Sequence, residues 1–249
     1  NAGAAIVHWT GAVSTVFENP NNWDAGVVPG FDDDAAIDGA TTNWPKFRTS
    51  STNAAPITLV SVGYLDKSGT LTMESGTLTA NCSLCGTKGG KAKANAYVKM
   101  TGGTIRLTGI HNTNGTTICN QGMFQWPRST DTTGGASGTF DMEGGLLDVG
   151  TMDLPLATTA NGTGIFNLKG GTLNIRAKNP MQVTPPDANG GLFIGENRQR
   201  TASYNGKLNI EAGKMILDGD ATALINRYVD TNAVIVPYPS GTGNKYIVR

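Results

Sequence analysis

The sequence has little charge and few aromatic residues, and it lacks any long apolar run. Only 15% of its 249 residues are charged, and 19 Lys and Arg balance 19 Asp and Glu. Nucleic acid is therefore not expected as a partner, because a phosphate-binding surface normally shows as a basic excess. No apolar run is long enough to cross a bilayer as a helix. Long amphipathic helical patterns are missing through most of the chain, which leaves an all-β architecture.

Glycine is abundant, at 34 residues, and it recurs within one repeated motif. Five segments align without gaps: 71–78 (LTMESGTL), 98–105 (VKMTGGTI), 140–147 (FDMEGGLL), 166–173 (FNLKGGTL) and 208–215 (LNIEAGKM). Their shared glycines are 27, 42, 26 and 42 residues apart. A period near 26 suits one coil of a solenoid, and the longer gaps suggest the same coil with about 15 extra residues in loops.

The alternation inside each segment predicts which side chains enter the core. We expect three stacked columns: Leu71, Val98, Phe140, Phe166 and Leu208; Met73, Met100, Met142, Leu168 and Ile210; Leu78, Ile105, Leu147, Leu173 and Met215. The shared glycine turns each corner, where a positive φ is easiest to place. The predicted fold class is all-β, a β-solenoid in the form of a right-handed parallel β-helix with a short C-terminal helix.

The chain divides into three predicted parts. Residues 1–55 form an N-terminal cap or assembly segment, residues 56–219 form the coils with two looped insertions, and residues 220–249 form a C-terminal cap. Within the last part, 221–229 has the pattern of an amphipathic helix, and closing strands follow it. A bare solenoid end exposes strand edges, so these segments must either cap the coils or join subunits.

The N-terminal part carries a family resemblance. Trp9-Thr10-Gly11, Asn22-Trp23, Pro29 and 33–37 (DDAAI) precede coils built around Gly-Gly-Thr-Leu. In these features the chain resembles secreted bacterial Gly-rich parallel β-helix proteins, including large extracellular proteins of planctomycetes and verrucomicrobia that often carry sorting or dockerin tails. The resemblance covers most of the chain and implies an extracellular or cell-surface location. It specifies no reaction.

Polysaccharide lyases and pectinase-like hydrolases also use this fold, and their sites need clustered carboxylates on an exposed sheet face. The outward columns instead place opposite charges on adjacent coils: Lys99 beside Asp141, Arg106 beside Asp148, and Lys169 between Glu143 and Glu211. Such pairs support stacked strands. No catalytic residue is therefore predicted. His8 and His111, the two histidines, lie apart from any nucleophile motif and are interpreted as bystanders.

Three cysteines are present, too few for a structural zinc site. Because the repeat alignment puts Cys85 and Cys119 on adjacent coils, we favour a disulfide between them, although sequence alone does not fix connectivity. Cys82 is then either buried and free or linked to another chain.

Two further kinds of site are considered. Asp32, Asp33 and Asp34 offer carboxylates for calcium without the spacing of a known calcium loop, so a solvated turn is favoured and no other cofactor or metal is expected. Asn81, Asn114 and Asn161 begin N-x-[ST] sequons, which matter only if the producing organism glycosylates them.

Phe124, Trp126 and Arg128 lie in one insertion and form a candidate sugar-binding platform, although a loop folded over the side of the solenoid is the favoured interpretation, because aromatic side chains gain from burial. We predict a non-catalytic extracellular structural or adhesion protein whose subunits associate head to tail into a filament or matrix. The alternative is a carbohydrate-binding module or a divergent β-helix polysaccharide lyase.

Overall fold

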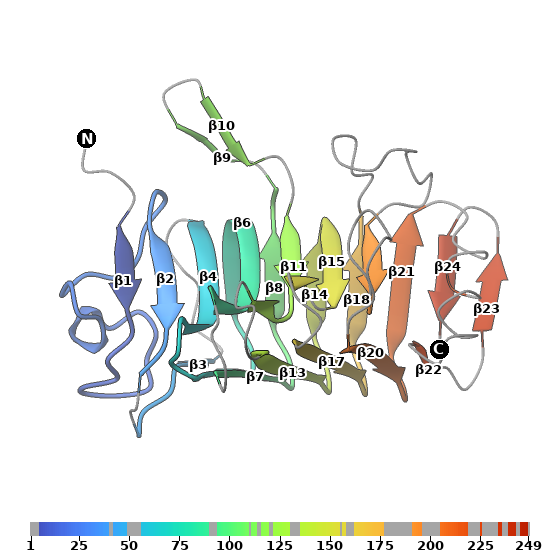
Figure 1. Cartoon of the computed structure of the whole chain (residues 1–249), viewed down its shortest axis with the longest axis horizontal. Coiled ribbons are helices and arrows are strands. Elements are labelled where there is room, and N and C mark those ends of the chain that lie inside the picture. The colour runs from blue at the N-terminus through green and yellow to red at the C-terminus, as the bar shows by residue number, and fades with distance from the viewer. Residues whose placement is uncertain are drawn as a thin grey trace.

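The computed structural model of the chain is all-β (Figure 1). It describes residues 5–39, 42–48, 56–89, 94–109, 111–113, 116–119, 122–129, 135–154, 156–157, 162–176, 191–195, 205–218, 225, 234–235, 239–242 and 245–248. Of the helix expected over 221–229, only Ile225 lies among them, and it is helical and buried. In the described part, no helix is long and apolar enough to span a membrane.

Two parallel sheets run along the molecule and carry most of its strands. The main path of the 13-stranded sheet contains β1 (Ile6–His8), β2 (Asp34–Ile37), β4 (Ile57–Tyr64), β6 (Thr77–Lys88), β8 (Thr104–Leu107), β14 (Leu146–Val149), β18 (Thr172–Ile175), β21 (Lys214–Asp218), β24 (Lys245–Val248) and β23 (Pro239–Thr242). A branch from β6 adds β11 (Met123–Gln125), β15 (Thr151–Leu154) and β19 (Leu192–Ile194). β24 and β23 are antiparallel to their neighbours and end the sheet.

The seven-stranded sheet forms the second wall, along the bottom of Figure 1. Its order is β22 (Val234–Ile235), β20 (Asn205–Ile210), β17 (Thr163–Leu168), β13 (Ser137–Met142), β7 (Asn95–Met100), β5 (Gly69–Met73) and β3 (Lys46–Phe47). Two small pairs lie outside the walls, the hairpin of β9 (His111–Thr113) with β10 (Thr116–Cys119) and the parallel pair of β12 (Arg128–Ser129) with β16 (Leu156–Ala157). A 3-10 turn, η1 (Pro20–Asn22), lies in the N-terminal segment.

The three predicted core columns are confirmed in register. Phe140 pairs with Val98 on one side and Phe166 on the other, and the pairing continues to Leu71 and Leu208. The methionine column follows the same strands of the seven-stranded sheet, and the column beyond the corner follows neighbouring strands of the 13-stranded sheet. The side chains of all three columns are buried. Each coil therefore covers the apolar face of the next, as a solenoid core requires.

The Gly-Gly corners are explained by two different constraints. The second glycine has the predicted positive φ, +77° at Gly103 and +82° at Gly145. The first glycine is needed for space, because a Cβ on Gly144 would lie 2.4 Å from the carbonyl oxygen of Thr101 on the preceding coil. At the three Gly-Gly corners, Gly102, Gly144 and Gly170 face a carbonyl oxygen of the preceding coil so closely that a side chain has no room, whereas Ser75 and Ala212 occupy this position in the first and last aligned coils.

The N-terminal segment caps the solenoid within its own chain. β1 pairs in parallel with β2 and so adds a strand to the 13-stranded sheet. Behind it, Trp9, Phe17, Trp23 and Phe47 are buried together, and the Trp23 indole N–H donates to the carbonyl of Phe17 at 2.9 Å. This aromatic cluster closes the apolar columns at that end.

Candidate functional site

The best-defined polar group on the outer face of the 13-stranded sheet is centred on Asp148. Its carboxylate accepts from Arg106 Nε at 3.1 Å and forms an ion pair with Arg176 Nε at 2.7 Å. Asn174 Nδ2 on the next coil also donates to it, at 3.0 Å. The predicted Arg106–Asp148 pair is therefore confirmed. The sequence pattern missed Arg176, which lies beyond the aligned motif. With Asp148 nearly buried and three donors around it, the group ties three coils together.

On the seven-stranded sheet, the predicted positions are confirmed, because Lys99 lies directly beside Asp141 in the register, but the predicted ion-pair partners are wrong. Asp141 was expected to pair with Lys99, but its ion pair is with Lys169 at 3.6 Å. It also accepts from Asn167 Nδ2 at 2.6 Å and from the Tyr97 hydroxyl at 3.2 Å. The pairs run diagonally because long side chains reach two positions along the neighbouring strand.

The ion pairs of Lys99 and Lys169 on this sheet both run along this diagonal. Lys99 contacts Glu143 at 3.1 Å. Lys169 follows the paired residues that place it between Glu143 and Glu211, as predicted, but its ion pair is with Asp141. Desolvation and the neighbouring Asp141 carboxylate raise the pKa of Tyr97. The phenol therefore stays protonated and able to donate.

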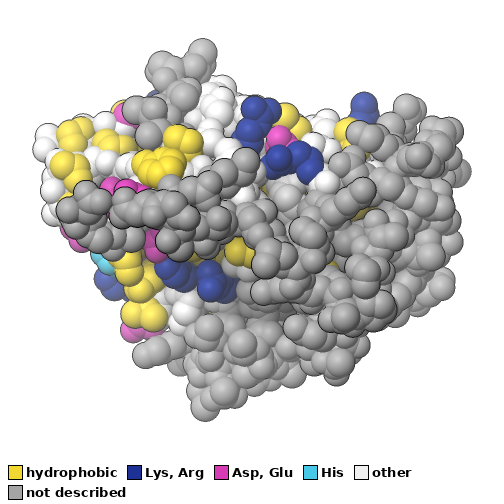
Figure 2. All heavy atoms as spheres, turned by 90° about the horizontal axis from the view of Figure 1, so that it is seen from above, with side chains coloured by type: hydrophobic (Ala, Val, Ile, Leu, Met, Phe, Trp, Pro, Cys, Tyr) yellow, Lys and Arg dark blue, Asp and Glu magenta, His cyan; other side chains and the backbone are white. Residues whose placement is uncertain are grey.

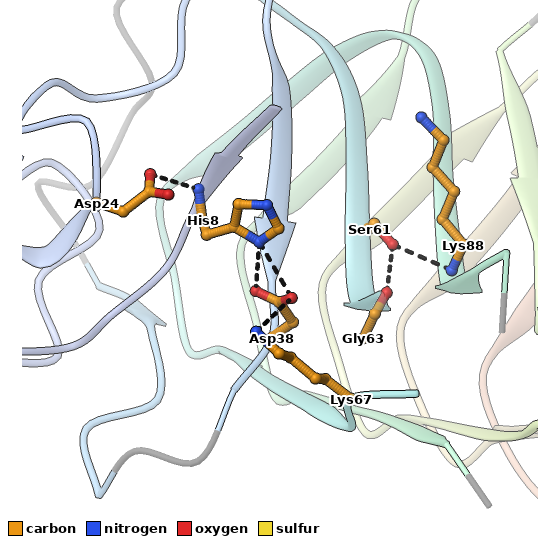
Figure 3. A network of polar contacts seen from close by, with 7 residues as sticks. All are labelled: His8, Asp24, Asp38, Ser61, Gly63, Lys67 and Lys88. Atoms are coloured by element: carbon orange, nitrogen blue, oxygen red, sulfur yellow. Dashed lines mark hydrogen bonds and ion pairs between the residues drawn. The ribbon is translucent and has the colours of Figure 1, made fainter. Parts of the chain in front are cut away.

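A histidine–carboxylate pair that the sequence did not suggest lies at the N-terminal end (Figure 3). The buried Asp38 faces His8 Nδ1 at 2.9 and 3.1 Å, and Lys67 Nζ lies 3.9 Å from the same carboxylate. Figure 3 shows three elements meeting here, because His8 is on β1 while Asp38 and Lys67 follow β2 and β4. When Nδ1 carries the proton, Nε2 is left as an acceptor.

The Asp38 carboxylate could orient the His8 imidazole for proton transfer, but the polar side chains nearby form hydrogen bonds with main-chain groups. The nearby Ser61 hydroxyl donates to the carbonyl of Gly63 and accepts from the Lys88 N–H at 3.2 Å (Figure 3). The main-chain N–H of His8 donates to Asp24 Oδ1 at 2.9 Å. The contacts of Ser61 join β4 to β6, whereas those of His8 with Asp24 and Asp38 hold β1 on the sheet. We therefore interpret the His8–Asp38 pair as a clasp, a contact that fastens the N-terminal cap to the sheet. No sequence motif could have found it, since 30 residues separate His8 from Asp38.

The proposed sugar platform is wrong for its two aromatic members. Phe124 and Trp126 are fully buried, and they stack at 5.5 Å and contact the rings of Phe140 and Phe166. β11 continues the sheet wall between β6 and β15, so its alternate residues point inward. Arg128, the third member, is half-buried in β12.

The predicted Cys85–Cys119 disulfide is also wrong. Cys85 is a buried free thiol, and Cys82 is the disulfide-bonded residue. On the sheet Cys85 lies between Ser61 and Gln125, whereas Cys119 belongs to β10, which pairs with β9; its side chain lies outside the described part. Burial raises the pKa of Cys85, which keeps it a thiol at neutral pH.

The three consecutive aspartates have separate roles. Asp33 Oδ2 accepts from the Gly30 N–H at 2.9 Å, Asp34 forms an ion pair with Lys88 Nζ at 2.6 Å, and Asp32 is exposed. Among the described residues, no group of three or more His, Cys, Asp and Glu is arranged to hold a metal ion. Calcium at Asp32–Asp34 stays a prediction.

One of the three sequons is blocked by the fold. Asn81 is buried in β6, and its Oδ1 accepts from the Thr108 hydroxyl at 2.9 Å, which contradicts glycosylation there. Asn114 and Asn161 lie outside the described residues, as does the side chain of His111.

No protein-family model, curated protein or solved structure matches the chain. The resemblance to secreted bacterial β-helix proteins therefore stays a prediction, and function has to be argued from the geometry of the chain itself.

Proposed function

We propose that this protein is a non-catalytic structural or adhesion protein of the cell surface or extracellular matrix, with a right-handed parallel β-helix as its rigid rod. The location rests on the resemblance carried by Trp9-Thr10-Gly11 and the segments that follow it. The right-handed sense of the coils is proposed from the rule that connections between parallel strands of one sheet are almost always right-handed.

The pairing of the outward carboxylates carries the proposal. A polysaccharide lyase or hydrolase needs a carboxylate that can take a proton, donate one or hold calcium. Asp141 and Asp148 instead receive donors from neighbouring coils, and the charges of Lys99 and Glu143 neutralise each other. Side chains engaged in this way stabilise the stack of coils. The alternative function, a divergent lyase, would require them to exchange these partners for substrate.

Self-association is the second element of the proposal, and the distribution of charge supports it. Residues 1–47 hold six Asp and Glu against one Lys, whereas residues 48–249 hold 13 acidic and 18 basic residues. The cap is thus acidic and the remainder basic, which favours contact between the cap of one copy and the body of another.

Exposed apolar side chains gather on the same cap. In the described part, the exposed large hydrophobics are Ile6, Val13, Val16, Val27 and Phe31, with Leu65 outside the cap. Figure 2 shows hydrophobic side chains at this end of the molecule. Strand addition at β1 is limited, because Asp24 already bonds the outer N–H and carbonyl of His8. The proposed contact between copies is therefore made by side chains.

Light scattering of the purified protein, over a range of concentrations at low and high salt, tests this assembly. We expect oligomers at low salt that dissociate as salt screens the attraction. Phe31→Asp is expected to favour the monomer, and Leu65→Asp, an equally exposed apolar residue outside the cap, should not. Wild-type protein that stays monomeric at high concentration and low salt would contradict self-association.

A further inference from the structure

Outward side chains of four neighbouring strands form a positively charged strip on the 13-stranded sheet. Pairing places Arg106 of β8 and Asn174 of β18 on either side of Asp148, and Thr172 of β18 beside Lys214 of β21. Positions 172, 174 and 176 alternate onto the same face, so Arg176 continues the line. Three cations and one carboxylate therefore share this strip, which comprises Arg106, Asp148, Thr172, Asn174, Arg176 and Lys214.

The two arginines present positive charge to solvent and keep the carboxylate beneath them. The side chains of Arg106 and Arg176 are 52% and 39% exposed, whereas that of Asp148 is 10% exposed. Both arginines contact Asp148 through Nε, which leaves the terminal nitrogens of Arg106 able to donate outward. Arg176 also donates through Nη2 to the carbonyl of Leu107 and so is held at two points. The guanidinium groups are thus positioned before a ligand arrives, which lowers the entropy cost of binding.

An open hollow extends the strip toward the corner of the last two aligned coils. It is lined by Gly171, Thr172, Ala212, Gly213 and Lys214. Because Gly171 and Gly213 have no side chains, the surface is recessed at this corner, and the Lys214 side chain is exposed beside the hollow. The hollow offers a hydroxyl and an ammonium group in one place, which suits a ligand that carries both hydroxyl groups and negative charge.

We propose that this strip binds an acidic polysaccharide through its carboxylate or sulfate groups, with the arginines and Lys214 as the anion contacts. The inference rests on the proposed extracellular role and names the ligand class for adhesion. A polysaccharide fits better than a nucleic acid, because three cations are spread among neutral hydroxyl and amide groups and the chain as a whole has no basic excess. The ligand lies on the outer face, while aromatic side chains stay in the core.

Binding of polygalacturonate, dextran sulfate and neutral dextran, measured by isothermal titration calorimetry at low salt, tests the proposal. The first two separate carboxylate from sulfate recognition, and neutral dextran should not bind. We expect Arg106→Gln and Lys214→Gln each to weaken binding about 2- to 5-fold, the range for one ion pair at an exposed site. Arg48→Gln, which removes an exposed arginine from its pair with Glu74 at the other end, should leave the affinity unchanged.

Lys214→Gln keeps the test independent of folding, because Asp148 retains both arginines in that variant. Absence of binding to both acidic polymers, equal loss in Arg48→Gln, or tighter binding of a DNA duplex than of either polymer would overturn the proposal. Polymer length is followed by size-exclusion chromatography in the same samples. Shortening of a bound polymer would contradict the non-catalytic function while leaving the binding strip in place.

Discussion

Phe166→Ala is expected to lower the free energy of unfolding by about 3–5 kcal/mol, the usual cost of removing a buried aromatic ring. The Phe166 ring is fully buried and stacks on Phe140 at 4.9 Å, with an angle of 7° between the rings. It also contacts Phe124 at 5.7 Å. Removal of the Phe166 ring leaves a cavity between two coils. The flanking backbone cannot close this cavity, because a shift would break the register of the paired strands. Urea denaturation measures the change.

The neighbouring residue on the same strand supplies the control. Ile165 points to the opposite face of β17 and is half-buried, so Ile165→Ala should cost about 1 kcal/mol or less. Similar midpoints for the two variants would mean that the assignment of inward and outward faces is wrong.

Gly138→Ala is expected to cost about 2–3 kcal/mol, because one added methyl group would collide with a buried indole. A Cβ at this position would lie 2.7 Å from Trp126 Nε1 and 2.8 Å from its Cδ1. Two more glycines leave room for Trp126: Gly86 lies beside its ring and Gly164 beside its carbonyl oxygen. Thermal and urea unfolding of the variant measure the loss.

Gly30→Ala is the matched control, since the nearest atom to its new Cβ would be Asp33 Oδ2 at 3.6 Å, an ordinary contact. It should change the stability by about 0.5 kcal/mol at most. If Gly138→Ala proved as stable as Gly30→Ala, Trp126 could not occupy the position described.

The coil register was predictable because two local rules agree. Alternation assigns Phe140 and Met142 to the core, and the glycine at 145 fixes where the corner falls. Five copies of the motif leave no other register in which both rules hold. These two rules do not explain the first glycine of the three Gly-Gly corners, because the constraint is a carbonyl group on another coil.

The inserted segments were predicted poorly, and the reason is pairing over long range. β6 continues past its contact with β8 to pair with β11, so Phe124 and Trp126 enter the core from a segment that reads as a loop. The same event places Gln125 beside Cys85 and removes the basis for the expected disulfide. The His8–Asp38 clasp joins segments that no local pattern connects. Sequence reasoning found the Arg106–Asp148 pair but missed Lys169 as the partner of Asp141, because the diagonal reach of a long side chain depends on its rotamer.

The claim that outward carboxylates hold the coils together, and perform no chemistry, is tested most directly at Asp148. Asp148→Asn keeps the shape of the side chain but removes the charge that Arg106 and Arg176 share. Unfolding in urea and the length of polygalacturonate incubated with each protein are measured side by side. We expect a loss of about 1–2 kcal/mol in stability, reduced from the value for a buried charged contact because both arginines are partly exposed, and no shortening of the polymer by either protein. A wild-type protein that shortens the polymer, together with an Asp148→Asn variant of unchanged stability that does not, would contradict the account.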